Sequence, residues 1–289
     1  MIYTLKNDAL TVEISDRGAE VRSIRDGQGR ERLWQGDAAY WEERAPILFP
    51  FCGRQWEGRY VAKGRSYDMG IHGFFRLRET TVERADEQEL VLVQTDGEDT
   101  RSIYPYAFSV RITYRLEGSC LSVRAEITNR GEETMFYGYG GHPGFRVPFG
   151  GGSLSDYHVA FPKGEAVRAA CFDASQTYPA GGTRPFSLSE GRRFVLDDEI
   201  FARESVFLCD TGDEAVLASD GAEGYVRITY EGFDWLGLWK CPGAEYLCME
   251  PWIGMPADSG RVTVLEEKAD LVRLEAGEKR THAYAIEIG

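Results

Sequence analysis

Apolar and polar positions alternate with a period of two along much of the chain, the pattern of strands with one buried face. The clearest example spans residues 106–116, where Phe108, Val110, Ile112, Tyr114 and Leu116 share one face. After a turn at Glu117-Gly118-Ser119, the alternation resumes through Leu121, Val123, Ala125 and Ile127. The two segments predict an antiparallel hairpin.

Shorter runs of the same kind recur from one end of the chain to the other. They cover residues 10–14, 90–93, 135–139, 206–208, 226–230, 236–239, 246–249, 262–265 and 283–288. Helical periodicity is confined to residues 37–44, which predict one short helix with Asp37 as its N-cap. About fifteen to twenty strands without a linker predict an all-β fold, a large antiparallel β-sandwich of two sheets packed face to face. We expect a single domain over residues 1–289.

Composition narrows the possible partners. The chain has 33 basic and 47 acidic side chains and a net charge of −14, which argues against nucleic acid and against an anionic membrane surface. No apolar run reaches the roughly 18 residues of a membrane span, and no signal peptide is visible. The six cysteines contain no CxxC pair, so a cytoplasmic location is expected. The four histidines lack metal-ligand spacing, and a structural zinc site is not expected.

Two polar clusters in the first third of the chain interrupt the β pattern. Phe49-Pro50-Phe51-Cys52-Gly53-Arg54 places an arginine after an apolar run, where its planar guanidinium can meet hydroxyl or carboxylate groups. A salt-bridging loop arginine is the alternative. His72-Gly73-Phe74-Phe75-Arg76 sets an imidazole beside aromatic rings, which suits sugar recognition, although a buried core histidine is equally consistent.

Two further clusters carry candidate acid–base groups. Tyr137-Gly138-Tyr139-Gly140-Gly141-His142-Pro143-Gly144-Phe145 surrounds one histidine with residues of unusual backbone geometry. In Tyr246-Leu247-Cys248-Met249-Glu250-Pro251-Trp252, a strand would put Tyr246, Cys248 and Glu250 on one face, and Pro251 is expected to end it. Apolar surroundings would raise the Glu250 pKa, as a general base requires, whereas pairing with an arginine is the alternative.

The order GR, HGFxR, GGHPGF and CxEPW resembles the aldose 1-epimerase (galactose mutarotase-like) family, in particular its LacX-type branch. The resemblance spans almost the whole chain. It implies a galactose mutarotase-like supersandwich that interconverts the α and β anomers of free sugars without a cofactor.

The resemblance also implies roles for particular residues. Glu250 matches the catalytic base and His142 the catalytic acid, while Arg54 and His72 match substrate-binding residues. Residues 194–201 resemble the stretch with a substrate-binding aspartate, which is Asp197 by its spacing to Phe201, with Asp198 as the alternative. Gly141 stands where the best-characterised galactose mutarotases carry asparagine before the histidine.

The expected function is therefore aldose 1-epimerase acting on a neutral aldohexose, with a small sugar as partner and the protein as monomer or homodimer. A related branch acts on hexose 6-phosphates, for which Arg54, Arg59, Arg65 and Arg76 supply cations. A non-catalytic sugar-binding or sensor protein is a second alternative. A glycoside hydrolase would need two carboxylates about 5–10 Å apart. The epimerase mechanism fails if Glu250 and His142 lie more than about 10 Å apart.

Overall fold

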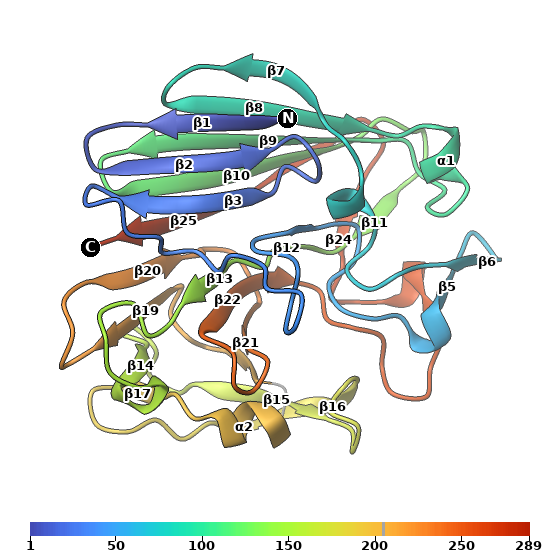
Figure 1. Ribbon diagram of the computed structural model, residues 1–289. Coiled ribbons are helices and arrows are strands. Elements are labelled where there is room, and N and C mark those ends of the chain that lie inside the picture. Colours follow the sequence, from blue (N-terminus) through green and yellow to red (C-terminus); the bar gives the residue numbers. More distant parts are fainter. Residues whose placement is uncertain (204–205) are drawn as a thin grey trace.

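The computed structural model describes residues 1–203 and 206–289, and its largest sheet has nine strands (Figure 1). Its members are β7 (Thr81–Ala85), β8 (Glu89–Thr95), β9 (Phe108–Glu117), β10 (Cys120–Asn129), β14 (Tyr157–Ala160), β17 (Arg193–Val195), β19 (Glu214–Ser219), β20 (Tyr225–Thr229) and β25 (Lys279–Ile288). They pair in the order β17-β14-β19-β20-β25-β10-β9-β8-β7.

The second large sheet has eight strands. They are β4 (Ile47–Leu48), β12 (Tyr139–Gly141), β13 (Gly144–Arg146), β15 (Arg168–Phe172), β16 (Pro179–Pro185), β18 (Val206–Cys209), β21 (Trp235–Trp239) and β22 (Tyr246–Ile253). Seven follow the order β16-β15-β18-β21-β22-β12-β4, and β13 pairs with β22 beside β12.

Smaller elements complete the described part of the chain. Three small sheets contain β1 (Ile2–Lys6), β2 (Leu10–Ser15) and β3 (Val21–Asp26), then β5 (Arg59–Ala62), β6 (Arg65–Asp68) and β23 (Thr263–Val264), and finally β11 (Met135–Tyr137) and β24 (Val272–Leu274). The α-helices are α1 (Glu98–Arg101) and α2 (Asp198–Arg203), and the 3₁₀ turns are Trp56–Gly58, Phe75–Leu77, Leu154–Asp156 and Leu265–Glu267.

Burial in the β9–β10 hairpin confirms the buried faces that the alternating pattern predicts. All five apolar residues on one face of β9 are buried, as are the four on β10. The turn is one residue shorter than expected, because Glu117 already pairs with Cys120. Inward residues of both large sheets belong to one continuous apolar cluster, so the all-β antiparallel prediction is confirmed.

The predicted helix over residues 37–44 is wrong. The backbone carbonyl of Asp37 accepts hydrogen bonds from the amide N–H groups of Tyr40 and Trp41, and its carboxylate accepts one from Ala39. These bonds close a single turn, and the chain does not continue as a helix beyond it. One turn gains too few hydrogen bonds to propagate alone. The segment instead delivers Trp41 to the site described below.

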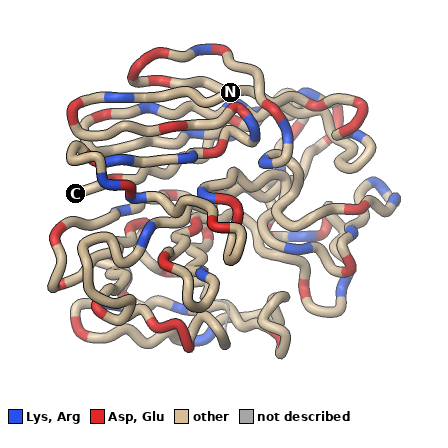
Figure 2. Tube along the Cα trace, in the orientation of Figure 1, with Lys and Arg blue, Asp and Glu red and all other residues tan. Residues whose placement is uncertain are grey.

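Charged side chains are dispersed over the molecule, with basic residues interspersed among acidic ones along the strands (Figure 2). Within the described residues, no helix is long and apolar enough to cross a membrane.

Candidate active site

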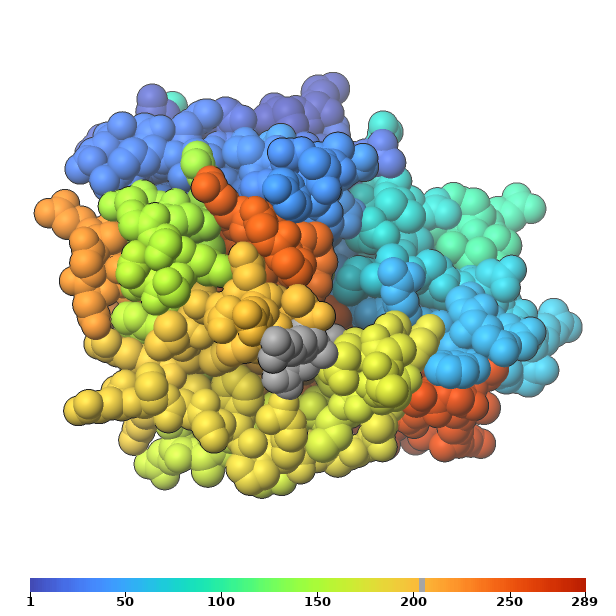
Figure 3. All heavy atoms as spheres, turned by 60° about the horizontal axis from the view of Figure 1, so that its bottom comes forward, coloured from blue at the N-terminus to red at the C-terminus, as the bar shows by residue number. Residues whose placement is uncertain are grey.

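A cleft of about 430 Å³ opens on the face of the eight-stranded sheet opposite the main core. It brings together Arg54, His72, His142 and Glu250, four of the five residues expected at a site. Its aromatic wall consists of Trp41, Phe172, Phe207, Trp239 and Trp252. These residues come from distant parts of the sequence. Figure 3 shows that early (blue), middle (yellow) and late (orange) segments of the chain lie side by side on one face of the molecule.

Strand β22 carries Glu250 and sorts its neighbours by face. Leu247 and Met249 belong to the main core, whereas Cys248 and Trp252 belong to separate clusters on the cleft side. The predicted sharing of one face by Tyr246, Cys248 and Glu250 agrees with this division.

Pro251 does not end β22, so that prediction is wrong. The strand continues to Ile253, and Pro251 pairs with Leu236 of β21. On the edge of β22 that faces β12 and β13, the amide N–H of Met249 donates to the carbonyl of Pro143. Every second backbone nitrogen of a strand points to the same edge, so the nitrogen of Pro251 points there too. Here the neighbouring strands β12 and β13 are interrupted, so a residue without an N–H is tolerated.

The same interruption places His142 opposite Glu250. His142 and Pro143 lie between β12 and β13, and β22 pairs with β13 up to Cys248 and with β12 from Trp252 onward. Nε2 of His142 consequently lies 3.1 Å from Oε2 of Glu250, with the two side chains 8% and 1% exposed. This contact is far inside the roughly 10 Å limit for two groups acting on one sugar ring.

Burial sets the protonation of this pair. It raises the pKa of Glu250 well above the usual value, and the indole N–H of Trp252 opposes the shift only in part. It lowers the pKa of His142 to about 3. Both shifts favour uncharged forms, so a single proton residing mainly on Glu250 is the expected state of the free cleft.

Several polar atoms in the cleft are ready for a ligand. Within the described residues, Nδ1 of His142 is buried without a hydrogen-bond partner, and Oε2 of Glu250 lies close to Nε2 of His142 without a hydrogen bond of good geometry. Buried polar groups left unpaired are costly, and a ligand rich in hydroxyl groups can satisfy them.

His72 is held in a strained conformation that orients its ring. Its φ is +62°, and its Nδ1 accepts the amide N–H of Gly53 at 3.0 Å. Burial, together with His142, Arg76 and Arg54, lowers its pKa well below 6.5. The ring is therefore neutral with its proton on Nε2, and it can donate to a ligand oxygen.

Two arginines near the cleft differ in availability. Arg76 forms an ion pair with Glu43 and donates to the carbonyl of Ile71, so its charge is already engaged. Arg54 lines the cleft with an exposed side chain. Arg54 is therefore the better placed of the two to bind a ligand.

The sequence model for aldose 1-epimerase matches residues 1–286. The chain belongs to the aldose 1-epimerase family. The chromosomal LacX protein of Lactococcus lactis subsp. lactis is 29% identical over 304 residues, an alignment that covers 100% of this chain and 99% of that protein.

Two solved structures resemble this member of the aldose 1-epimerase family over their full length. A galactose mutarotase related enzyme from Lactobacillus acidophilus is 28% identical with a TM-score of 0.93, covering 100% of this chain and 97% of its own. A galactose mutarotase-like protein from Lactobacillus casei ATCC 334 is 26% identical with a TM-score of 0.94, covering 100% of both chains.

The fifth residue expected from the aldose 1-epimerase resemblance does not lie with the other four. Asp197 is exposed, accepts the amide N–H of Glu199 at the start of α2, and is not among the residues that line the cleft. The alternative, Asp198, forms an ion pair with Lys240, the buried residue that follows β21. We therefore assign neither aspartate to the cleft.

Sequence reasoning missed the aromatic wall of this epimerase-family cleft. Trp41 lies against His142 with ring centroids 4.9 Å apart, and Trp239 approaches the same ring at 5.7 Å. The predicted helix over residues 37–44 contains Trp41, and the predicted strand over residues 236–239 contains Trp239. The alternation in residues 236–239 marked a strand but could not tell which side chain would face a cleft.

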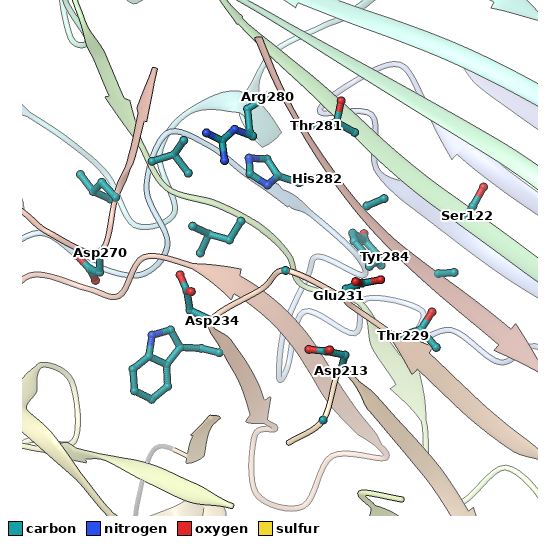
Figure 4. Close-up of a pocket in the computed structure, with 18 of the residues that line it drawn as sticks. Ser122, Asp213, Thr229, Glu231, Asp234, Asp270, Arg280, Thr281, His282 and Tyr284 are labelled. Carbon is teal, nitrogen blue, oxygen red and sulfur yellow. The ribbon is translucent and has the colours of Figure 1, made fainter. Parts of the chain in front are cut away.

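A larger hollow of about 1170 Å³ lies elsewhere in the molecule (Figure 4). Arg280, Thr281, His282 and Tyr284 of β25 line it, together with Asp213, Asp234 and Asp270. It contains none of the five residues expected from the aldose 1-epimerase resemblance.

Proposed function

We propose that the protein is an aldose 1-epimerase that interconverts the α and β anomers of a neutral aldohexose. The observation that carries the proposal is the 3.1 Å contact between His142 Nε2 and Glu250 Oε2 in an aromatic cleft. Anomer exchange needs one group that takes a proton from the C1 hydroxyl and another that gives a proton to the ring oxygen.

Glu250 is the base in this mechanism. Its carboxylate takes the proton of the C1 hydroxyl while the His142 imidazolium gives its proton to the ring oxygen, and the C1–ring oxygen bond breaks. The open sugar rotates about C1–C2. It then closes on the other face as Glu250 returns a proton and His142 takes one back.

A single proton shared by Glu250 and His142 is enough for both ring opening and ring closure. Ring opening begins with ionised Glu250 and protonated His142, and it ends with protonated Glu250 and neutral His142. The second arrangement is the one that burial favours in the free cleft. Both arrangements lie on the reaction path, and the number of protons held by the pair never changes.

The remaining groups hold the sugar. His72 donates from Nε2 to a ring or hydroxyl oxygen, and Arg54 donates to hydroxyl groups from the rim. The flat rings of Trp41, Trp239 and Phe207 face the apolar C–H surfaces of the sugar and exclude water from the reacting atoms.

The cleft favours a neutral sugar over the alternatives. A hexose 6-phosphate would need several cations for its phosphate; among the described residues, Arg54 is the one arginine or lysine lining the cleft, and Arg76 is already paired with Glu43. A glycoside hydrolase would need a second free carboxylate, and in the described part of the chain the other carboxylate lining the cleft is that of Glu43, which is paired with Arg76. A sensor would have no use for an acid–base pair.

Polarimetry tests the proposal directly. Freshly dissolved α-glucose and α-galactose should reach anomeric equilibrium faster with the protein than without it, after the spontaneous rate is subtracted. Turnover of glucose 6-phosphate measured in parallel should be slower. Binding of an aldose with no acceleration would favour the sensor, and a thousandfold preference for the phosphate would favour the phosphorylated substrate.

A further inference from the structure

A buried cysteine lies beside the acid–base pair. Cys248 is on β22, two residues before Glu250 and on the same face, and its side chain is fully buried. A ring nitrogen of His142, the Sγ of Cys248 and a carboxylate oxygen of Glu250 all lie within 4.8 Å of one another. The proposed epimerase mechanism makes no use of the thiol.

We propose that His142, Cys248 and Glu250 form an inhibitory zinc site on the floor of the cleft. An imidazole, a thiolate and a carboxylate are the three ligand types that bind Zn²⁺ in proteins. The thiolate disfavours Mg²⁺ and Ca²⁺, which prefer oxygen ligands.

The geometry requires only a small closure. Zinc–ligand bonds of roughly 2.0–2.3 Å in a tetrahedron place the ligand atoms roughly 3.3–3.8 Å apart. The nitrogen and oxygen are already 3.1 Å apart, and the widest separation in the trio is at most 4.8 Å. Side-chain shifts of about 1 Å therefore complete three of four positions. Because His142 and Glu250 line the cleft, water from the cleft can fill the fourth position.

The charges also balance. Zinc binding releases the protons of the Cys248 thiol and the Glu250 carboxyl to solvent, and Zn²⁺ neutralises the two negative charges of the resulting thiolate and carboxylate beside a neutral imidazole. A buried cluster without net charge avoids much of the desolvation penalty of an isolated ion. Bound zinc would occupy both catalytic groups, so it should stop mutarotation by competing with the sugar for the same atoms.

The metal site itself is tested by binding. Metal-free protein is titrated with Co²⁺, and the thiolate-to-cobalt charge-transfer band is measured in the near ultraviolet. Wild type should show the band, and Cys248→Ala should lose it and bind at least about 100-fold more weakly. Cys52→Ala is the matched control, because Cys52 is also buried and precedes the cleft residue Gly53. It should bind Co²⁺ as wild type does.

The consequence for activity is tested with Zn²⁺, and this part rests on the proposed function. Zinc should inhibit wild-type mutarotation, and EDTA should restore it. Cys248→Ala should keep its mutarotation and require at least about 100-fold more zinc for inhibition.

The two proposals can fail separately. Equal Co²⁺ binding by wild type and Cys248→Ala, or an equal loss in Cys52→Ala, would overturn the metal site. A cobalt band that depends on Cys248, in a protein that accelerates mutarotation of no aldose, would keep the metal site and overturn the epimerase. If Cys248→Ala unfolds early by circular dichroism, Cys248→Ser, which keeps the size but lacks the thiolate, decides by the same readout.

Discussion

Glu250 and His142 must be treated as one titrating unit, because they are in contact and both are buried. Burial holds the pKa of His142 at about 3 and raises that of Glu250 well above its usual value. The proposed mechanism needs one proton on the pair, so mutarotation should be lost when a second proton is added at low pH or the last one is removed at high pH.

The pH–rate profile should therefore be a broad bell. Its acidic limb should lie well below pH 6.5, the usual histidine value, and its basic limb well above 4.5, the usual glutamate value. Initial mutarotation rates from about pH 3 to 10 measure both limbs, with the spontaneous rate subtracted at each pH. An acidic limb centred near 6.5 would mean that His142 titrates as an exposed histidine.

Glu250→Gln should lower the mutarotation rate by about 10²–10⁴-fold while sugar affinity changes little. Glutamine keeps the shape and an acceptor oxygen but cannot take the C1 proton. Polarimetry gives the rate and titration calorimetry the affinity. Glu245→Gln, an exposed substitution just before β22, is the control and should match wild type. Full activity in Glu250→Gln would show that another group is the base.

Arg54→Ala should act on binding rather than on proton transfer. Loss of a hydrogen bond from a charged donor costs about 1.5–3 kcal/mol, so KM for the sugar should rise about tenfold or more. The value of kcat should fall much less, since Arg54 contacts no reacting proton in the proposed mechanism. An unchanged KM would place Arg54 outside the sugar contacts.

The glycines on either side of the His142-Pro143 segment position His142 through close packing. A Cβ atom added at Gly141 would lie 2.6 Å from the ring of Tyr284, and one at Gly144 would lie 2.8 Å from Trp41. Gly141 therefore stands where a larger residue would push the His142 segment off β25.

Gly141→Ala should destabilise the protein by about 1–3 kcal/mol, the usual result of overpacking, and should lower kcat by displacing His142. Urea unfolding gives the free energy and polarimetry the rate. Gly70→Ala is the control, because a Cβ there meets no atom within 4 Å. Equal stability of the two variants would mean that Tyr284 can move aside.

Once residues 246–252 are taken as a strand, Glu250 and Cys248 fall on one face, because side-chain direction in a strand depends only on local geometry. The nearness of His142 to Glu250 could not be derived from spacing, since it depends on which strands pair with β22. The aromatic wall was missed for the same reason. The expectation for Asp197 rests on the family resemblance alone, and its exposed position at the start of α2 depends on local loop geometry.

The whole molecule should lose stability in mild acid through its buried histidines. Burial lowers the pKa of His282 to about 4, so the folded protein resists a proton that the unfolded chain accepts near pH 6.5. Above pH 6.5, His282 is neutral in both states and does not reduce the free energy of unfolding. As the pH falls from 6.5 toward 4, the free energy of unfolding decreases.

At pH 5 the loss from His282 alone should be about 2 kcal/mol, at 1.36 kcal/mol per pH unit. Urea unfolding at pH 7.5 and pH 5 measures it. His282→Gln keeps a polar group near the hydroxyl of Tyr137 but does not titrate, so its stability should vary less with pH. An identical pH dependence in both proteins would exclude His282 as a source.

The residues of the cleft differ in how freely they can change during evolution, because some are held by core strands and others lie on loops. The proposed reacting pair lies on and between strands that also build the core, so its spacing cannot change without loss of the fold. Arg54, Gln176 and Thr177 lie outside the named strands and helices and contribute to the cleft rim. Loops can be exchanged between relatives while the ladder stays intact. A lineage of this fold can therefore change which sugar it accepts and keep the same chemistry.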